Sequence, residues 1–122
     1  MSNLIRNYTT GAATAAYRIA KFGSADGAVV QAAAATDAAI GVFDELAHDS
    51  GERADVIRDG YALVEYGGTV TRGDWLTADA DGKAVKASPA AGDNASAIGR
   101  AEVSGVAGDI VSIVLAIGQI QG

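Results

Sequence analysis

Short apolar runs alternate with turns rich in glycine or aspartate from Tyr17 onward, at a spacing of roughly ten residues. Two of these turns, Asp59-Gly60 and Asp81-Gly82, each lie between two strand-like runs, and an Asp-Gly pair supplies the positive φ angles of a two-residue hairpin. The pattern predicts an all-β chain that forms a small β-barrel or a sandwich-like domain. The predicted strands are Tyr17–Phe22, Ala28–Gln31, Ile40–Phe43, Arg53–Arg58, Tyr61–Tyr66, Asp74–Ala78, Lys83–Ala87, Ala97–Glu102 and Asp109–Ile117.

Two segments depart from this pattern. Residues 1–16 hold few large apolar side chains and no regular period, which predicts a flexible, extended N-terminal arm that becomes ordered against a partner. Residues 17–122 then form a single β-rich domain. The alanine-rich stretch Gln31–Ala39 has high helix propensity, so it forms either one short helix or a loop whose alanines pack closely.

A short pattern occurs twice along the chain. Ala39-Ile40-Gly41 precedes Gly51-Glu52, and Ala97-Ile98-Gly99 precedes Gly108-Asp109 at a similar distance. Each Gly-acid pair leads into a β-branched run, and Gly73-Asp74 is a third copy of the same turn. A glycine at a tight turn followed by an acid that accepts nearby backbone N–H groups is a sound way to begin a strand. The repeated pattern indicates one β-unit used twice.

Composition and charge exclude several classes of site. The chain has 27 alanines, 16 glycines, one histidine and no cysteine, which rules out a thiolate nucleophile, a cysteine-ligated metal and a multi-histidine site. Its net charge of −6 argues against nucleic acid or an anionic membrane as a partner. The apolar run Ile110–Ile117 is too short to span a bilayer, and the N-terminal residues lack a signal-peptide pattern, so we expect a product assembled in a cytoplasm.

No residue pattern predicts catalysis. His48, Asp49 and Ser50 are adjacent on one loop, where they cannot adopt the geometry of a catalytic triad, and His48 is expected to be a solvated loop residue. The stretch Asp79–Gly82 resembles the start of a calcium loop but lacks its later ligands, and a hairpin turn explains it equally well. We therefore predict no enzyme, no catalytic residue, no cofactor, no metal site and no small-molecule substrate.

Taken together, residues 29–116 resemble the capsid cement, or head decoration, proteins of tailed bacteriophages. The resemblance lies in the order and spacing of structural turns and strands, and it covers about three-quarters of the chain. The residues that carry it are Ala39-Ile40-Gly41-Val42-Phe43, Ser50-Gly51-Glu52, Asp59-Gly60, Gly67-Gly68-Thr69-Val70-Thr71-Arg72-Gly73-Asp74, Asp79-Ala80-Asp81-Gly82-Lys83, Ala97-Ile98-Gly99-Arg100-Ala101 and Ala107-Gly108-Asp109-Ile110-Val111.

The resemblance implies a structural virion protein. Proteins of this family bind the outer surface of an expanded capsid as homotrimers at three-fold and quasi-three-fold positions, and they stabilise the shell against internal DNA pressure. The implied partner is the major capsid protein, and the implied location is the virion, after assembly in the host cytoplasm. Since the arm of related proteins reaches a capsid subunit, we predict that Leu4, Ile5 and Tyr8 are apolar anchors and that Arg6 supplies a charge.

A second hypothesis is a small β-sandwich module that binds carbohydrate, in a phage virion or a bacterium. Trp75 together with Tyr61 or Tyr66 would provide the stacking surface, because aromatic rings offer an apolar face with a polar edge. Large side chains are also needed to fill space between the many alanines, so the same residues suit a purely structural role.

Overall fold

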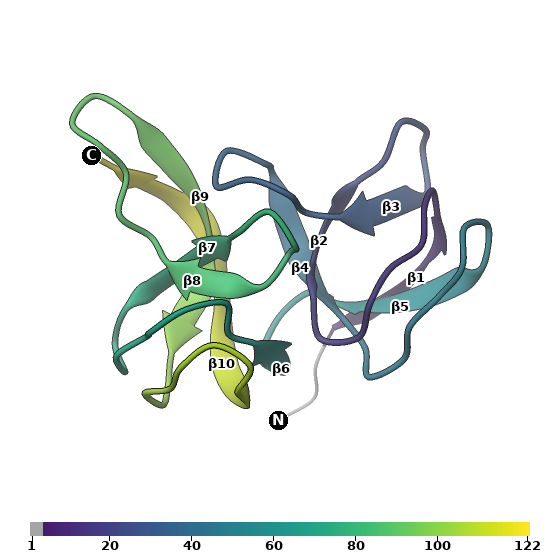
Figure 1. The fold of residues 1–122 in the computed structure, drawn as a ribbon. Coiled ribbons are helices and arrows are strands. Elements are labelled where there is room, and N and C mark those ends of the chain that lie inside the picture. The colour runs from purple at the N-terminus through teal and green to yellow at the C-terminus, as the bar shows by residue number, and fades with distance from the viewer. Residues whose placement is uncertain (1–3) are drawn as a thin grey trace.

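The structure is a computed structural model that describes residues 4–122, and these residues form ten β-strands and no helix. The first five strands close into a barrel in the order β1-β3-β2-β4-β5, drawn in purple to teal in Figure 1. The barrel closes because β1 pairs in parallel with β3 and antiparallel with β5. These strands are β1 (Ile5–Thr10), β2 (Ile19–Phe22), β3 (Ala28–Gln31), β4 (Ala39–Phe43) and β5 (Arg53–Ile57).

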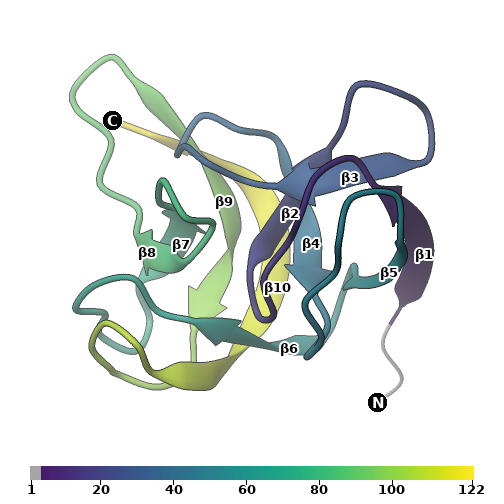
Figure 2. The ribbon, with the colours of Figure 1, turned by 45° about the vertical axis from the view of Figure 1, so that its right-hand side comes forward.

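The last five strands form a second sheet in the order β6-β10-β9-β7-β8. Figure 2 shows this sheet beside the barrel, with β6 leading from the barrel side into the sheet along the bottom of the view. The long β10 is antiparallel to both β6 and β9, and its pairing with β9 contains a bulge between Leu115 and Gly118. These strands are β6 (Tyr61–Glu65), β7 (Trp75–Ala78), β8 (Ala84–Lys86), β9 (Asn94–Ala101) and β10 (Ile110–Gln121).

The two halves repeat one arrangement of strands. Reading around the barrel from β3 gives β3-β2-β4-β5-β1, and reading across the sheet from β8 gives β8-β7-β9-β10-β6. Each strand of the second half therefore occupies the place of the strand five positions earlier in the chain. In the barrel, parallel pairing of β1 with β3 closes the sheet. In the second half the equivalent pairing is reduced to one parallel bridge, between Tyr66, the residue after β6, and Ala84 of β8.

Backbone hydrogen bonds in the connections repeat as well. The N–H of Thr10 donates to the carbonyl of Glu52 over 2.8 Å, and the N–H of Tyr66 donates to the carbonyl of Asp109 over 2.8 Å. The turns before β5 and β10 are closed by the acid predicted from the sequence: Glu52 accepts from the N–H of Asp49, and Asp109 accepts from the N–H of Val106. The prediction of one β-unit used twice is confirmed, and we call residues 4–59 the first unit and residues 60–122 the second unit.

The third copy of this turn has the same bond. The N–H of Thr71 donates to Asp74, three residues later, over 2.9 Å, and Gly73 beside it has a φ angle of 92°. The position of Gly73 in the first unit is taken by Tyr17, which has a φ angle of 62°. An L-residue with a side chain rarely adopts this left-handed conformation, so the first unit holds a strained residue where the second has glycine.

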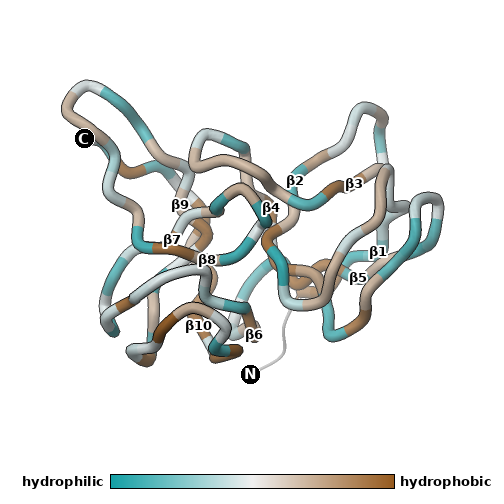
Figure 3. The backbone as a smooth tube through the Cα atoms, viewed as in Figure 1, coloured by the Kyte–Doolittle hydropathy of each residue, from teal (hydrophilic) through white to brown (hydrophobic). Residues whose placement is uncertain are grey.

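Two apolar clusters hold the fold together. One fills the barrel, and it includes Tyr8, Phe43 and Val56. The other fills the second unit, and it also includes Ile19 and Val42 from the barrel wall. Figure 3 shows short, strongly hydrophobic segments, such as the one in β3, between long pale stretches, which fits a core rich in alanine. The second unit is therefore completed by side chains of the first.

The structure confirms the all-β prediction, and β2 to β10 each overlap a predicted strand. Residues 32–38 form the irregular connection between β3 and β4, so the loop alternative for the alanine-rich stretch holds, and the helix alternative is wrong. Only the two ends of the stretch pack closely: Ala32 and Ala39 are buried, whereas Ala33, Ala34 and Ala38 are exposed.

The prediction of an extended arm over residues 1–16 is wrong for its described part. Residues 5–10 form β1, and Thr14 makes an antiparallel bridge with His48. The polar pattern of this segment did not indicate a strand. The strand forms because it pairs with β3 and β5, which are distant in sequence, and such pairing decides strand formation more strongly than local preference. Residues 1–3 lie outside the described residues.

Candidate interaction surfaces

The four residues predicted as capsid anchors divide into two groups. Leu4, Ile5 and Arg6 are exposed, with Leu4 and Ile5 at 50% and 51% of their full surface, whereas Tyr8 is buried in the barrel. The Tyr8 hydroxyl accepts a hydrogen bond of 2.6 Å from Arg58, and its ring lies edge-on to Phe22 with 6.4 Å between centroids. Tyr8 is thus part of the core, and the prediction that it is a surface anchor is wrong.

The exposed residues of β1 lie on two different surfaces. Side chains alternate along a strand, so Leu4 and Arg6 share a side with Tyr8, which faces the barrel interior, and they lie at the end of the barrel. Ile5 and Asn7 face the outer wall, where Ile5 pairs with Ile57 and Asn7 pairs with Asp55 of β5. The Asn7 amide donates to the Asp55 carboxylate over 3.0 Å.

A groove of about 310 Å³ lies between the barrel and β6. It is lined by Tyr17, Phe43, Asp44, Glu45 and Ile57 of the first unit and by Tyr61–Leu63 of the second, and we call it the first groove. The Tyr17 carbonyl accepts from the N–H of Glu65, which fixes β6 along the edge of this groove. The first groove is the place where the first unit meets the leading strand of the second.

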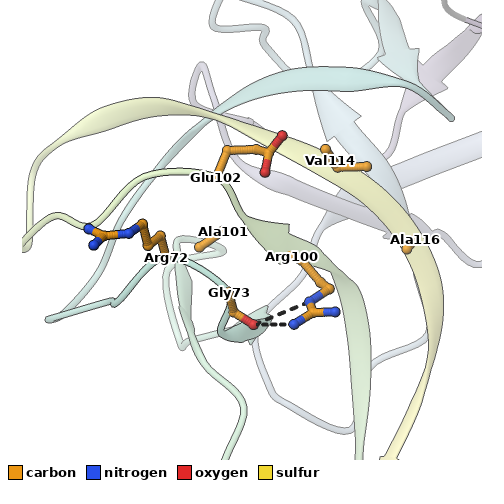
Figure 4. Close-up of a pocket in the computed structure, with 7 residues that line it drawn as sticks. All are labelled: Arg72, Gly73, Arg100, Ala101, Glu102, Val114 and Ala116. Atoms are coloured by element: carbon orange, nitrogen blue, oxygen red, sulfur yellow. Dashed lines mark hydrogen bonds between the residues drawn. The ribbon is translucent and has the colours of Figure 1, made fainter.

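A groove of about 470 Å³ lies on the second unit at the corresponding place. Figure 4 shows that its walls come from the turn before β7 and from β9 and β10. The guanidinium of Arg100 donates two hydrogen bonds, of 3.2 and 3.0 Å, to the Gly73 carbonyl. This second groove is lined by Arg72, Gly73, Arg100, Ala101, Glu102, Val114 and Ala116.

The two grooves are built from equivalent positions. Ile57 and Val114 occupy the same place in the two units, because Val42 pairs with Ile57 and Arg100 pairs with Val114. One step further along the strand, the N–H of Phe43 donates to the Arg18 carbonyl, and the N–H of Ala101 donates to the Asp74 carbonyl, each over 2.9 Å. The acids that follow, Asp44 and Glu102, line their respective grooves.

The aromatic residues of the carbohydrate hypothesis do not form one stacking surface. Tyr66 is fully buried, and its hydroxyl donates to the Val103 carbonyl over 2.8 Å. The guanidinium carbon of Arg100 lies 5.1 Å from the centre of the Trp75 ring and covers one of its faces. Tyr61 is half-exposed, but its strand is separated from that of Trp75 by β10 and β9, which puts the two backbones about 14 Å apart.

Burial raises the pKa of the Tyr66 hydroxyl, and the negative charges of Asp74 and Asp109 raise it further. The hydroxyl is therefore held in its neutral form, in which it donates to Val103. It serves the interior of the second unit, and it is not displayed to a ligand.

His48 and the Asp79–Gly82 turn have structural roles. The His48 side chain is only 11% exposed and its Nε2 lies 3.3 Å from the Asp44 carboxylate, so the prediction of a solvated histidine is wrong. Asp79 accepts hydrogen bonds from the N–H groups of Asp81 and Lys83 inside the β7–β8 hairpin. Within residues 4–122 no three or more His, Asp or Glu side chains gather as a metal site, and no helix could cross a membrane.

The sequence reasoning overlooked Arg72, Arg100 and the groove beside them. A signal was present, because Arg100 is a charged residue in a strand whose counterpart β4 is entirely apolar or glycine. It could be interpreted only once the repeat had been aligned strand by strand, which needs the pairing observed in the structure.

Comparison with known proteins finds a solved structure with a similar fold. No family model matches the chain, and no curated protein matches it in sequence. The structure is similar to that of the N base of head fiber gp8.5 in bacteriophage phi29, with a TM-score of 0.72 and 22% sequence identity. The match covers 94% of this chain and 95% of the other, so both units and their arrangement belong to the shared fold.

Proposed function

We propose that this chain is a structural protein of a phage virion that binds the outer surface of an expanded capsid. In this proposal it forms homotrimers at the three-fold and quasi-three-fold positions, contacts the major capsid protein and stabilises the shell against internal DNA pressure. It acts without catalysis, cofactor or nucleic-acid contact. The observation that supports a virion role is the fold shared, over nearly its full length, with the base of a phage head fiber.

The surface that we assign to the capsid is the end of the barrel that carries Leu4 and Arg6. Both residues are exposed, and the backbone around them is held in place: the Leu4 N–H donates to Asp59, and the Leu4 carbonyl accepts from Arg58 over 2.7 Å. A fixed apolar side chain next to a cation is a suitable anchor, because little conformational entropy is lost when it binds. Many identical sites on a shell multiply weak contacts of this kind.

Co-sedimentation with expanded shells that lack the protein tests the proposal. The readout is the number of copies bound per capsid subunit at saturation, and we expect a ratio near one, with trimeric density over three-fold positions. The double variant Leu4→Asp, Arg6→Glu should bind at least tenfold more weakly. Leu46→Asp is the matched control, since Leu46 is an equally exposed apolar residue in the β4–β5 connection. Failure of the wild-type chain to bind cognate shells contradicts the proposal.

The same experiment separates a second candidate, the base of a head fiber. The structure that is similar to this chain is described as the base of a head fiber, and this description is the reason for considering a second role. A fiber base would saturate at few copies per shell, at a subset of positions, and would leave the shell's resistance to heating unchanged. A decoration protein would cover the lattice and raise the temperature at which the shell releases DNA.

A further inference from the structure

We propose that the second groove binds the outer wall of β1 and β5 of a second copy of this chain, so that copies associate head to tail. This inference deepens the proposed homotrimer by naming its two surfaces, and it rests on the proposed function to that extent. Its argument comes from the repeat within the chain, in which the groove of one unit is bordered by the leading strand of the next. The backbone hydrogen bond of that contact is not repeated, since the N–H of Thr9 donates to Gly27 and the Gly73 carbonyl accepts from Arg100, so the proposed contact is made by side chains.

The first groove already contains the model for the contact. Its first-unit wall is formed around Tyr17, Asp44 and Ile57, and β6 of the following unit borders it. The Tyr17 carbonyl accepts a 3.0 Å hydrogen bond from Glu65 of that strand. The second groove repeats this wall with Gly73, Glu102 and Val114, but within residues 4–122 no strand follows to border it.

The strand that corresponds to β6 is β1. Ile5 pairs with Ile57 and Tyr61 pairs with Val114, so Ile5 of β1 occupies the place of Tyr61 in β6. The first unit of a second copy carries this strand, and we infer that it takes the place beside the second groove. Its Ile5 is half-exposed and lies on the outer wall, where it is available to a neighbour.

Charge supports the same pairing of surfaces. Arg72 and Arg100 are exposed in the second groove, which also holds the acid Glu102. Asp55 and Asp59 are exposed beside Ile5 on the wall of the first unit, which also carries Arg53. Opposite charges across an interface set its orientation and speed association. Ala116 is a small, exposed residue of the groove, and we place the Ile5 side chain against it.

Two different surfaces joined in this way form a heterologous interface, which closes into a ring when the rotation between copies permits. Each copy contributes its groove to one neighbour and its wall to the other. A closed ring of three copies would leave no groove unoccupied, and it is the arrangement that a three-fold position on a shell can accept.

Analytical ultracentrifugation of the isolated full-length chain, without shells, tests this inference. We expect the wild type to sediment as three chains at about 0.5 mM, a concentration that detects even weak interfaces. Ile5→Lys blocks the wall, and Ala116→Lys blocks the groove beside two arginines, so each variant alone should sediment as one chain. An equimolar mixture should sediment as two chains, because each variant retains the surface that the other lacks.

Controls make every outcome informative. Leu46→Lys changes an exposed apolar residue of the β4–β5 connection, which is not among the residues assigned to either surface, and should sediment like the wild type. Both test positions are exposed, and circular dichroism checks that the variants remain folded. A monomeric wild type, a variant that still forms trimers, or a mixture that stays monomeric overturns the inference. Shell binding by a monomeric wild type would retain the capsid-surface proposal and remove only the head-to-tail contact and the preformed trimer.

Discussion

The two units share one strand order but close in different ways. In the first unit β1 pairs with both β3 and β5, and the barrel is complete within the unit. In the second unit β6 pairs fully with β10 only, and the seam toward β8 is a single bridge between Tyr66 and Ala84. The second unit is closed instead by Ile19 and Val42 of the first, which belong to its apolar cluster.

This difference shows how a chain with 27 alanines gains a sufficient core. Small side chains leave each unit with little apolar surface to bury, and buried apolar area is the main favourable term in folding. Placing one wall of the first unit against the open side of the second adds Val42 and Ile19 to the second core without adding residues. The equivalent wall of the second unit carries Arg100 and Trp75, and no strand within residues 4–122 covers it.

Exchanging the residues at one equivalent position has the largest expected effect. Val42→Arg places a charge in a fully buried site between the units and should lower the free energy of unfolding by about 4 kcal/mol or more. Arg100→Val, the reverse exchange, removes an exposed cation–π contact and should change it by less than about 1 kcal/mol. Urea denaturation followed by circular dichroism measures both. Equal effects would show that the two walls are not distinguished by burial.

A second prediction concerns Gly41 and Gly99, the glycines of the sequence pattern that occurs in both units. A Cβ at Gly41 would overlap the carbonyl oxygen of Ile57, and a Cβ at Gly99 would overlap that of Val114. Gly41→Ala and Gly99→Ala should therefore each destabilise the protein by about 2 kcal/mol, through overpacking. Gly118→Ala is the control, because a Cβ there has open space, and it should change stability by less than about 0.5 kcal/mol. Thermal denaturation compares the three variants, and a tolerated alanine at only one of the first two positions would break the equivalence of the units.

A third prediction concerns Tyr66→Phe, which removes the hydrogen bond to Val103 and should destabilise the protein by about 1 kcal/mol at neutral pH. Because the pKa of Tyr66 is raised in the folded state, the wild type keeps this stabilisation below the unfolded tyrosine pKa of about 10 and loses it as pH rises further. The difference in unfolding free energy between wild type and variant should thus shrink above pH 10. Urea titrations at neutral and alkaline pH measure it, and a constant difference would mean that Tyr66 is ionised equally in both states.

Local patterns were sufficient for most of the strands and for the turns. Asp81-Gly82 and the Gly-acid pairs act through bonds within a few residues, so their structure could be inferred from the sequence alone. β1 could not, since its strand forms through pairing with β5, which is distant in the chain. The burial of Tyr8 and His48 depends on the same long-range contacts, and both were predicted to be exposed.

The candidate surfaces were predictable only in part. Leu4, Ile5 and Arg6 are exposed as expected, because they lie at the start of a strand near the end of the barrel. The second groove depends on which side of β9 Arg100 faces, and a single residue of register decides that. The pairing of Arg100 with Trp75 and Val114 settles it.

The closure of the barrel by its first strand has a consequence for synthesis. β1 leaves the ribosome before the other nine strands of residues 4–122, yet its antiparallel partner ends at Ile57, so this seam cannot form until Ile57 has emerged. Contacts between residues so far apart slow folding, and unpaired strand edges are exposed to other chains in the interval. The nascent first unit is therefore most vulnerable to mispairing before Ile57 emerges, whereas Ile19 and Val42 on its wall stay uncovered until the second unit has followed.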